Sequence, residues 1–244
     1  MPRVKLSVII PAFNEAARIE GCLQSLFAAL KSCARDGLTS EIIVVDNNST
    51  DATADLARKA GVRVVFEPIN HIARARNAGA AVATGDWLLF LDADTLFPAA
   101  TLADALAAMQ NDRVVGGGSA LDFGKLTFAA RLLVLLCNLV VRLFKMTPGC
   151  FLFCRGDAFR AVGGFDEKFF AGEDAEMGKA LKRWGRERGL RLAILHRHPP
   201  LTSNRKFQLY GVRKIFVLLV RFVFTPRTTM TDKRYLDVFY DGRR

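Results

Sequence analysis

Two carboxylates, Asp92 and Asp94, stand two residues apart directly after the apolar run Trp87–Leu91. At the end of a strand, side chains at this spacing point the same way and can share a hard divalent cation and a ribose hydroxyl. The same spacing also occurs in solvated turns. The fully apolar run before it favours the cation-binding interpretation.

A third carboxylate, Asp46, follows the apolar run Ile42–Val45 in the same manner. It could accept a hydrogen bond from a nucleobase edge or a ribose hydroxyl, or it could cap a helix that begins near Asp51. Arg74 and Arg76 could lie on the surface, or they could reach a diphosphate, because a guanidinium pairs well with phosphate oxygens.

Apolar runs and helical segments alternate through the first hundred residues. The sequence predicts strands at Leu6–Ile10, Glu41–Val45, Val62–Phe66 and Trp87–Leu91, and helices at Ala16–Lys31, Asp51–Ala60 and Ala73–Ala83. This alternation predicts an α/β fold with a mostly parallel central sheet and helices on both faces. Ligands of such sheets bind beyond the carboxyl ends of the strands, where these acidic residues are expected to lie.

The second half of the chain has a less regular pattern. We expect a strand that ends at Gly116–Gly118, short strands at Cys150–Cys154 and Leu192–Leu195, and a helix at Glu173–Arg188 that stops at Gly189. No repeat or linker divides the chain, so we expect a single domain of residues 1–205. Residues 206–244 are expected to form a basic, amphipathic C-terminal extension.

The net charge of +11 is concentrated in the last quarter of the chain. Residues 179–244 carry 17 basic and 4 acidic side chains, whereas residues 1–178 carry 18 and 20. Such a segment calls for an anionic partner. Its aromatic residues are not interleaved with the basic ones as stacking platforms, so no nucleic acid partner is expected.

Two apolar segments carry a thin basic stripe. The first surrounds Leu132–Val141, and its stripe contains Arg131, Asn138, Arg142 and Lys145; the stripe of the second contains Lys206, Arg213, Lys214 and Arg221. Neither segment reaches the ~20 apolar residues of a spanning helix. Each could be a core helix with a solvated edge, or it could lie in a membrane interface.

The N-terminus and the cysteines bear on the compartment. The first five residues lead straight into a predicted strand, which leaves no room for a secretory signal. Five cysteines without paired spacing are typical of reduced thiols, and the three histidines are not spaced with them as zinc ligands. We expect a cytoplasmic protein, peripheral at the inner face of the cell membrane.

Six ordered blocks carry a resemblance to a known family. The blocks are Ser7–Glu15, Ile43–Asp51, Ala75–Gly79, Gly85–Asp94, Gly163–Glu167 and Gly172–Glu176. Together they resemble family 2 glycosyltransferases with the GT-A fold, over roughly residues 5–205. Six blocks in the right order are specific for fold and reaction class, which no single block would be.

The resemblance implies inverting, metal-dependent transfer of a sugar from a nucleotide-diphosphate donor to a hydroxyl acceptor. It implies a nucleotide-binding half at residues 1–98 and an acceptor half at 99–205. Asp94 would bind Mg²⁺ or Mn²⁺, and Asp174 would be the catalytic base, supported by Glu173. The nucleotide site is expected to contain Pro11, Ala12, Phe13, Glu15, Asp46, Asn48, Arg76, Asp92 and Arg205.

A histidine completes the metal shell in some members of the family, and His196 and His198 follow the predicted strand Leu192–Leu195. We favour His198, because the two prolines after it hold its backbone extended; a surface histidine is the alternative. Residues 148–151 read Pro-Gly-Cys-Phe where relatives often have a Gly-Asp-Gln type of loop, and His71 stands where glycine is common. These departures leave the donor sugar and the acceptor open.

Two other classes of function remain. A nucleotidyltransferase on a similar sheet would need a glycine-rich loop with a lysine near the first strand, and Pro11–Glu15 is not such a loop. A non-catalytic basic module that binds lipid or nucleic acid would account for the C-terminal charge alone.

Overall fold

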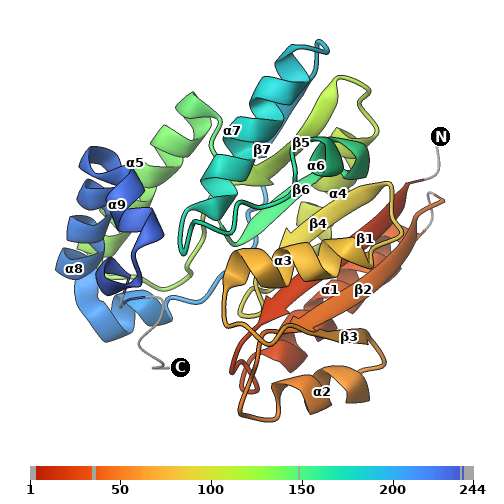
Figure 1. Cartoon of the computed structure of the whole chain (residues 1–244), viewed down its shortest axis with the longest axis horizontal. Helices are drawn as coiled ribbons and strands as arrows, with labels where there is room; N and C mark the ends of the chain where they lie inside the picture. The colour runs from red at the N-terminus through yellow and green to blue at the C-terminus, as the bar shows by residue number, and fades with distance from the viewer. Residues whose placement is uncertain (1–3, 35–36, 148, 237, 239–244) are drawn as a thin grey trace.

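A seven-stranded sheet in the order β3-β2-β1-β4-β6-β5-β7 forms the centre of the computed structural model, which describes residues 4–34, 37–147, 149–236 and 238 (Figure 1). The strands are β1 (Lys5–Ala12), β2 (Thr39–Asp46), β3 (Arg63–Phe66), β4 (Trp87–Leu91), β5 (Val114–Ser119), β6 (Phe151–Arg155) and β7 (Arg191–Leu195). Only β6 runs antiparallel to its neighbours, β4 and β5; the other pairs are parallel. The predicted mixed α/β fold is confirmed.

Helices cover both faces of the sheet. One face packs against α1 (Ile19–Cys33), α2 (Thr53–Lys59) and α4 (Ala99–Met109). The other packs against α3 (Ile72–Ala81), α6 (Gly156–Ala161) and α7 (Glu173–Arg186). Successive residues of β1 serve the two layers in turn, because Val8 and Ile10 belong to the first and Ile9 to the second.

A small residue sets the spacing of α3 against the sheet. Gly79 lies so close to the side chains of Ile9 and Val45 that a Cβ at this position would overlap both. The helix can therefore approach the strands closely, which brings the side chains of its other turns toward the carboxyl ends of β1 and β4.

The predicted elements are correct in kind, and several bounds differ. β4 has the expected bounds, whereas β1 extends to Ala12, so that Pro11 lies in the strand. Helix α1 begins at Ile19, three residues later than predicted, and the backbone N–H groups at the predicted start bind side chains near the start of α2. The backbone N–H of Glu15 donates to Thr53 Oγ1 at 2.8 Å, and that of Ala16 to Asp51 Oδ2 at 3.1 Å.

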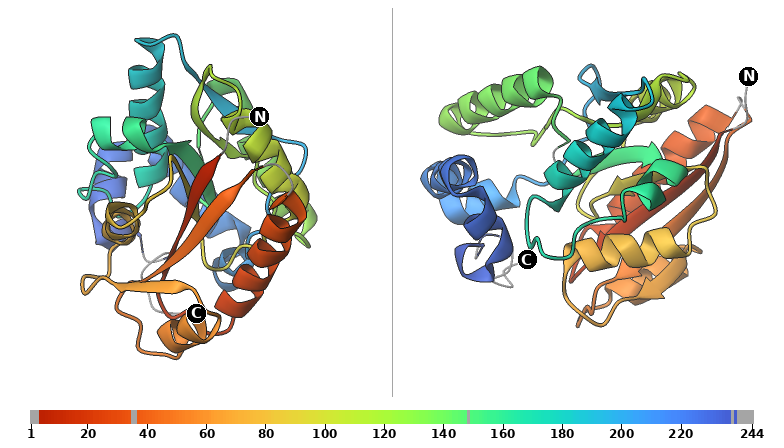
Figure 2. Two further views of the ribbon diagram at one scale, coloured as in Figure 1. Left: turned by 90° about the vertical axis from the view of Figure 1, so that its right-hand side faces the viewer. Right: turned by 45° about the horizontal axis from the view of Figure 1, so that its top comes forward.

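Three helices gather beyond the carboxyl ends of the parallel strands: α5 (Phe128–Phe144), α8 (Arg205–Phe224) and α9 (Pro226–Thr231), followed by a short 3₁₀ turn, Lys233–Tyr235 (Figures 1 and 2). Helix α8 contains a kink at Gly211, whose φ of 69° is readily adopted by glycine. A small cluster of Ala171, Leu218, Leu236 and Val238 joins these helices to the loop before α7. The described part of the predicted extension thus packs on the domain; residues 237 and 239–244 lie outside the described part.

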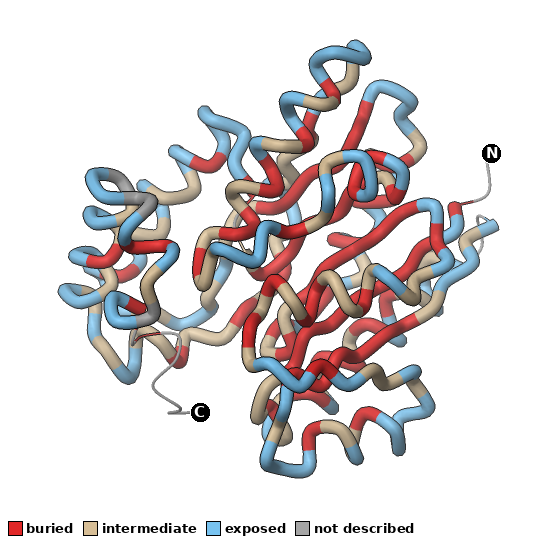
Figure 3. The backbone as a smooth tube through the Cα atoms, viewed as in Figure 1, coloured by how far each residue is buried: buried red, intermediate tan, exposed pale blue. Residues whose placement is uncertain are grey.

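The core-helix interpretation does not hold for α5, whereas α8 contributes Leu218 to a buried apolar cluster. In α5 only Ala130 and Val141 are buried, and much of α5 and α8 is exposed (Figure 3). Within the described ranges no helix is long and apolar enough to cross a membrane.

Candidate functional site

Five carboxylates meet at the carboxyl ends of the central strands. Glu15 follows β1, and Asp92 and Asp94 follow β4. Glu173 and Asp174 form the first turn of α7, which is preceded by Gly172 in a left-handed conformation (φ 75°). The parallel topology explains the meeting, because it places the ends of β1 and β4 at one edge of the sheet.

Arg76 connects a carboxylate that follows β4 with a carboxylate in the first turn of α7. This side chain on α3 is only 2% exposed, and its Nη2 donates to Asp92 Oδ1 and to the carbonyl of Gly149, both at 2.9 Å. Its Nη1 forms an ion pair with Glu173. Sequence reasoning interpreted Arg76 as a diphosphate ligand, whereas in the structure it binds carboxylates and joins the end of β4 to the start of α7.

Arg205 pairs with the remaining carboxylates. It is the first residue of α8 and is buried, with Nη2 3.1 Å from Glu15 Oε1 and 3.6 Å from Asp94 Oδ2. Thr202, three residues earlier, donates from Oγ1 to Asp94 Oδ1 at 3.5 Å. The loop before α8 therefore lies against the acidic edge.

Asp174 is buried beside Thr147, which the sequence did not single out, and beside Gly149 of the departing stretch 148–151. Thr147 Oγ1 donates to the Asp174 carbonyl at 2.8 Å, and a Cβ on Gly149 would lie 3.0 Å from Asp174 Oδ2. Burial, reinforced by the charge of Glu173, raises the pKa of Asp174 to about 7, although the nearby Arg76 acts in the opposite direction. A carboxylate with a pKa near neutrality is suited to accept and release protons. Pro148 lies outside the described residues.

Asp92 and Asp94 form the negative end of the site. Burial and then the charges of Asp92 and Glu15 raise the pKa of Asp94 to about 6, and burial also raises the pKa of Asp92. Carboxylate oxygens are preferred ligands of Mg²⁺ and Mn²⁺, and a cation would relieve this excess of negative charge. Mg²⁺ is commonly held by one or two carboxylates together with substrate phosphates, so the pair fits a cation bound jointly with a diphosphate.

The predicted histidine ligand does not join this pair. The ring of His198 is half exposed, and its Nδ1 lies 3.0 Å from Asp104 Oδ2 on α4. His196 is exposed as well, with its ring near the carbonyl of Ile194. Among the described residues no group of three or more His, Cys, Asp and Glu side chains is arranged to hold a metal.

The other predicted nucleotide-site residues lie around the ends of β1 and β2. Pro11, Ala12 and Asp46 are buried in the strand ends, and Phe13 lies partly exposed in the loop after β1. Asn48 has a φ of 66° in the loop after β2, where the N–H of Ser49 donates to Asp46 Oδ1 at 3.0 Å.

The helix-capping alternative for Asp46 is wrong, because the side chain that accepts from the first turn of α2 is Asp51, which precedes the N-cap Ala52. The N–H of Thr53 in the first turn of α2 donates to Asp51 Oδ1 at 3.0 Å. The Asp46 side chain instead stabilises the loop that directly follows β2.

Solved structures share this fold across nearly the whole chain. A mannosyltransferase from Pyrobaculum calidifontis in complex with GDP-Man and Mn²⁺ aligns over 98% of this chain and 69% of its own, with a TM-score of 0.70 and 22% identity. Glucosyl-3-phosphoglycerate synthase from Mycobacterium tuberculosis, in complex with Mn²⁺, UDP and glucosyl-3-phosphoglycerate, aligns over 94% and 81%, with a TM-score of 0.61 and 22% identity. The expected GT-A fold is confirmed.

Curated relatives match shorter stretches of sequence. A PGL/p-HBAD biosynthesis glycosyltransferase of Mycobacterium bovis (strain BCG / Pasteur 1173P2) is 39% identical over 108 residues, 41% of this chain and 40% of its own length. The succinoglycan biosynthesis protein ExoA of Rhizobium meliloti (strain 1021) is 28% identical over 212 residues, 73% of this chain and 58% of its own. The chain thus spans less than two thirds of the length of either relative.

The sequence profile of glycosyl transferase family 2 matches residues 7–160, a range that begins within β1, extends past β6 and includes the acidic pair after β4. This range is more than half of the chain. The chain belongs to glycosyl transferase family 2.

Proposed function

We propose that the protein transfers a sugar from a nucleotide-diphosphate donor to the hydroxyl of an acceptor, with inversion and with a divalent cation. The observation that carries this proposal is the buried Asp174, whose pKa is raised to about 7 at the edge of the sheet where Asp92 and Asp94 lie. A proton acceptor near neutral pH thus lies in one site with a cation-binding carboxylate pair.

Asp174 acts as the general base. The acceptor oxygen attacks the anomeric carbon of the donor, the bond from that carbon to the diphosphate breaks, and the diphosphate leaves with the bonding electrons. The acceptor proton moves to the Asp174 carboxylate. Glu173 supports this step, because its ion pair with Arg76 fixes the first turn of α7.

Asp94 and Asp92 would hold Mg²⁺ or Mn²⁺, and Asp92 also lies near the donor ribose. A cation held there would neutralise the charge that develops on the leaving diphosphate. The two solved relatives described above contain Mn²⁺, which supports the choice of metal class. Arg205 would bind the diphosphate once the donor enters.

The nucleoside would lie between the ends of β1 and β2, with Asp46 at the base. The other residues proposed to line it are Pro11, Ala12, Phe13, Glu15 and Asn48. Arg76 is proposed to position Asp92 through their ion pair, instead of contacting the phosphates. The basic C-terminal quarter supports a peripheral location at a membrane surface, where the acceptor hydroxyl would be presented.

Release of nucleoside diphosphate from a panel of nucleotide sugars in the presence of Mn²⁺ tests the proposal. We expect release from at least one donor and loss of that release in EDTA. Pyrophosphate release from a nucleoside triphosphate would instead identify a nucleotidyltransferase. Turnover of none of the donors, together with salt-sensitive binding of nucleic acid, would identify a non-catalytic basic module.

A further inference from the structure

Helix α5 presents an apolar face to the outside of the molecule. Phe128, Leu132, Leu135, Leu139 and Leu143 follow one another at steps of three and four residues and form a single stripe, and every one of them is exposed. Leu135 and Leu143 are 65% and 66% exposed. A continuous apolar surface of this kind is unusual on a monomer and marks an interaction site.

The side of α5 that faces the body contains Ala130 and Val141, which are buried, and Asn138, which is partly buried. The side chain of Asn138 donates to the Leu121 carbonyl at 2.9 Å and accepts from the Leu121 N–H at 2.7 Å. This pair of hydrogen bonds fixes the rotation of α5 about its axis. The helix thus packs on the body through Ala130, Val141 and this amide, and it leaves its stripe of large apolar side chains exposed.

The charges around this face have one sign. Residues 123–147 contain four basic side chains and no acidic one, and α8, which contacts α5, contains five basic and no acidic ones. Phe123 and Phe207 connect the two segments through an edge-to-face ring contact with centroids 5.2 Å apart. Docking of a second copy through this face would bring like charges together, whereas an anionic bilayer provides both acyl chains for the leucines and phosphates for the basic groups.

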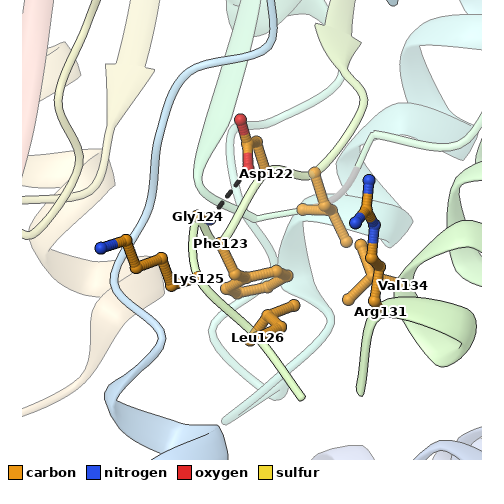
Figure 4. Close-up of a pocket in the computed structure, with 8 residues that line it drawn as sticks. Asp122, Phe123, Gly124, Lys125, Leu126, Arg131 and Val134 are labelled. Atoms are coloured by element: carbon orange, nitrogen blue, oxygen red, sulfur yellow. Dashed lines mark hydrogen bonds between the residues drawn. The ribbon is translucent and has the colours of Figure 1, made fainter. Parts of the chain in front are cut away.

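A pocket of about 470 Å³ lies at the N-terminal end of α5 (Figure 4). Its lining combines the apolar side chains of Phe123, Leu126 and Val134 with the basic residues Lys125 and Arg131. The lining contains one acidic residue, Asp122, and its side chain accepts a hydrogen bond from Gly124 N–H at 2.8 Å. This lining matches an amphiphile with a phosphate group.

We infer that the apolar face of α5 inserts among the headgroups of an anionic membrane and that the pocket at its start binds the phosphate of one of those lipids. The inference deepens the membrane location proposed above and rests on it. It does not rest on glycosyl transfer, so the two proposals can fail separately.

Vesicle flotation without nucleotide tests the inference. We expect the full chain to float with vesicles of phosphatidylcholine and phosphatidylglycerol, and not with phosphatidylcholine alone. Leu139→Asp, at a side chain 53% exposed, should lower the bound fraction several-fold. Phe27→Asp on α1, at a side chain 41% exposed, is the matched control and should bind like the wild type.

A second pair of variants tests the charges. Arg142→Glu on α5 should weaken flotation several-fold, and Lys59→Glu on α2, also exposed, should not. For the pocket, Arg131→Gln should lower the affinity for phosphatidylglycerol vesicles and leave the thermal unfolding midpoint unchanged.

Absence of flotation with anionic vesicles would overturn the inference, and so would equal flotation of Leu139→Asp and the wild type. Lipid-free dimerisation that Leu139→Asp abolishes would assign the face to a second copy instead. Nucleoside diphosphate release in the absence of vesicles should be the same for Leu139→Asp and the wild type. A chain that floats with anionic vesicles and releases no nucleoside diphosphate would refute the proposed function, and the inference that α5 binds membranes would still hold.

Discussion

The acidic edge of the sheet and the α5 face differ in which side chains they bury: the acidic edge buries charged groups, and the α5 face exposes apolar ones. At the acidic edge, charged side chains are buried, and Arg76 and Arg205 pair with carboxylates from β1, β4 and α7. On the α5 face, large apolar side chains are exposed, and Ala130, Val141 and Asn138 anchor the helix to the body.

The difference shows where each region finds its partners. Buried charges are tolerated only when paired, so the acidic edge is built largely from groups within the chain, with negative charge left over for a cation. The exposed leucines of α5 bury little apolar surface within the chain, and a partner outside the chain would explain their exposure. Substitutions at the acidic edge should therefore change stability and catalysis, whereas substitutions on α5 should change neither.

The largest effect is expected for Asp174→Asn. An amide cannot accept the acceptor proton, so the rate of nucleoside diphosphate release should fall by about 10²–10⁴-fold, the usual contribution of a general base. The thermal unfolding midpoint should not decrease, because the substitution removes a buried charge. Glu176→Gln, two residues further along α7, is the control and should keep the wild-type rate; equal rates for Asp174→Asn and this control would exclude Asp174 as the base.

Arg76→Met should destabilise the fold more than any surface substitution. Removal of the guanidinium leaves Glu173 and Asp92 as uncompensated charges, which costs about 3–5 kcal/mol in the free energy of unfolding. Urea unfolding at pH 7 measures this cost. Arg58→Met on α2 removes an exposed ion pair with Asp55 and should cost less than about 1 kcal/mol. A similar cost for both would mean that the Arg76 pairs contribute no more than surface pairs.

The rate should depend on pH through Asp174. The base works only when deprotonated, and burial raises its pKa to about 7, so the rate should fall as pH decreases below 7. Each further pH unit well below the pKa should lower the rate about tenfold. The profile of kcat between pH 5 and 8 measures this, with donor and metal saturating. A flat profile down to pH 5 would contradict a raised pKa in the catalytic complex.

The smallest effect is expected on α5. Leu139→Ser should change the free energy of unfolding by less than about 0.5 kcal/mol, because the side chain is already exposed in the folded chain. Leu89→Ala in β4 should cost about 2–5 kcal/mol, because Leu89 is fully buried. Urea unfolding of both variants compares the two regions directly. A core-like cost at Leu139 would mean that α5 packs against the domain in solution.

The sequence predicted the central strands β1 and β4 well, because they are buried on both faces. The run Trp87–Leu91 has no polar residue, so its bounds and the acidic pair after it could be located from the pattern alone. The capping side chain of α2 was harder to assign, since Asp46 and Asp51 both precede the helix and only the fold selects Asp51.

Contacts between distant residues could not be predicted in this way. Arg76 pairs with Glu173 across 97 residues, and no local pattern indicates that its partner is a carboxylate instead of a phosphate. The ring of His198 lies beside Asp104 because β7 and α4 are neighbours in the fold, which the chain order does not indicate. The orientation of α5 depends on the amide of Asn138 and on the burial of Ala130 and Val141, and the helical periodicity alone does not indicate which side faces the core.

The anomeric configuration of the first-formed product tests the central claim most directly. The account has one carboxylate base, Asp174, and no protein nucleophile, so the acceptor oxygen displaces the diphosphate in a single step. Proton NMR during turnover of an active donor should show a product with the configuration opposite to that of the donor. A product that retains the donor configuration would contradict the account, because retention requires a second displacement or attack from the face that the diphosphate leaves.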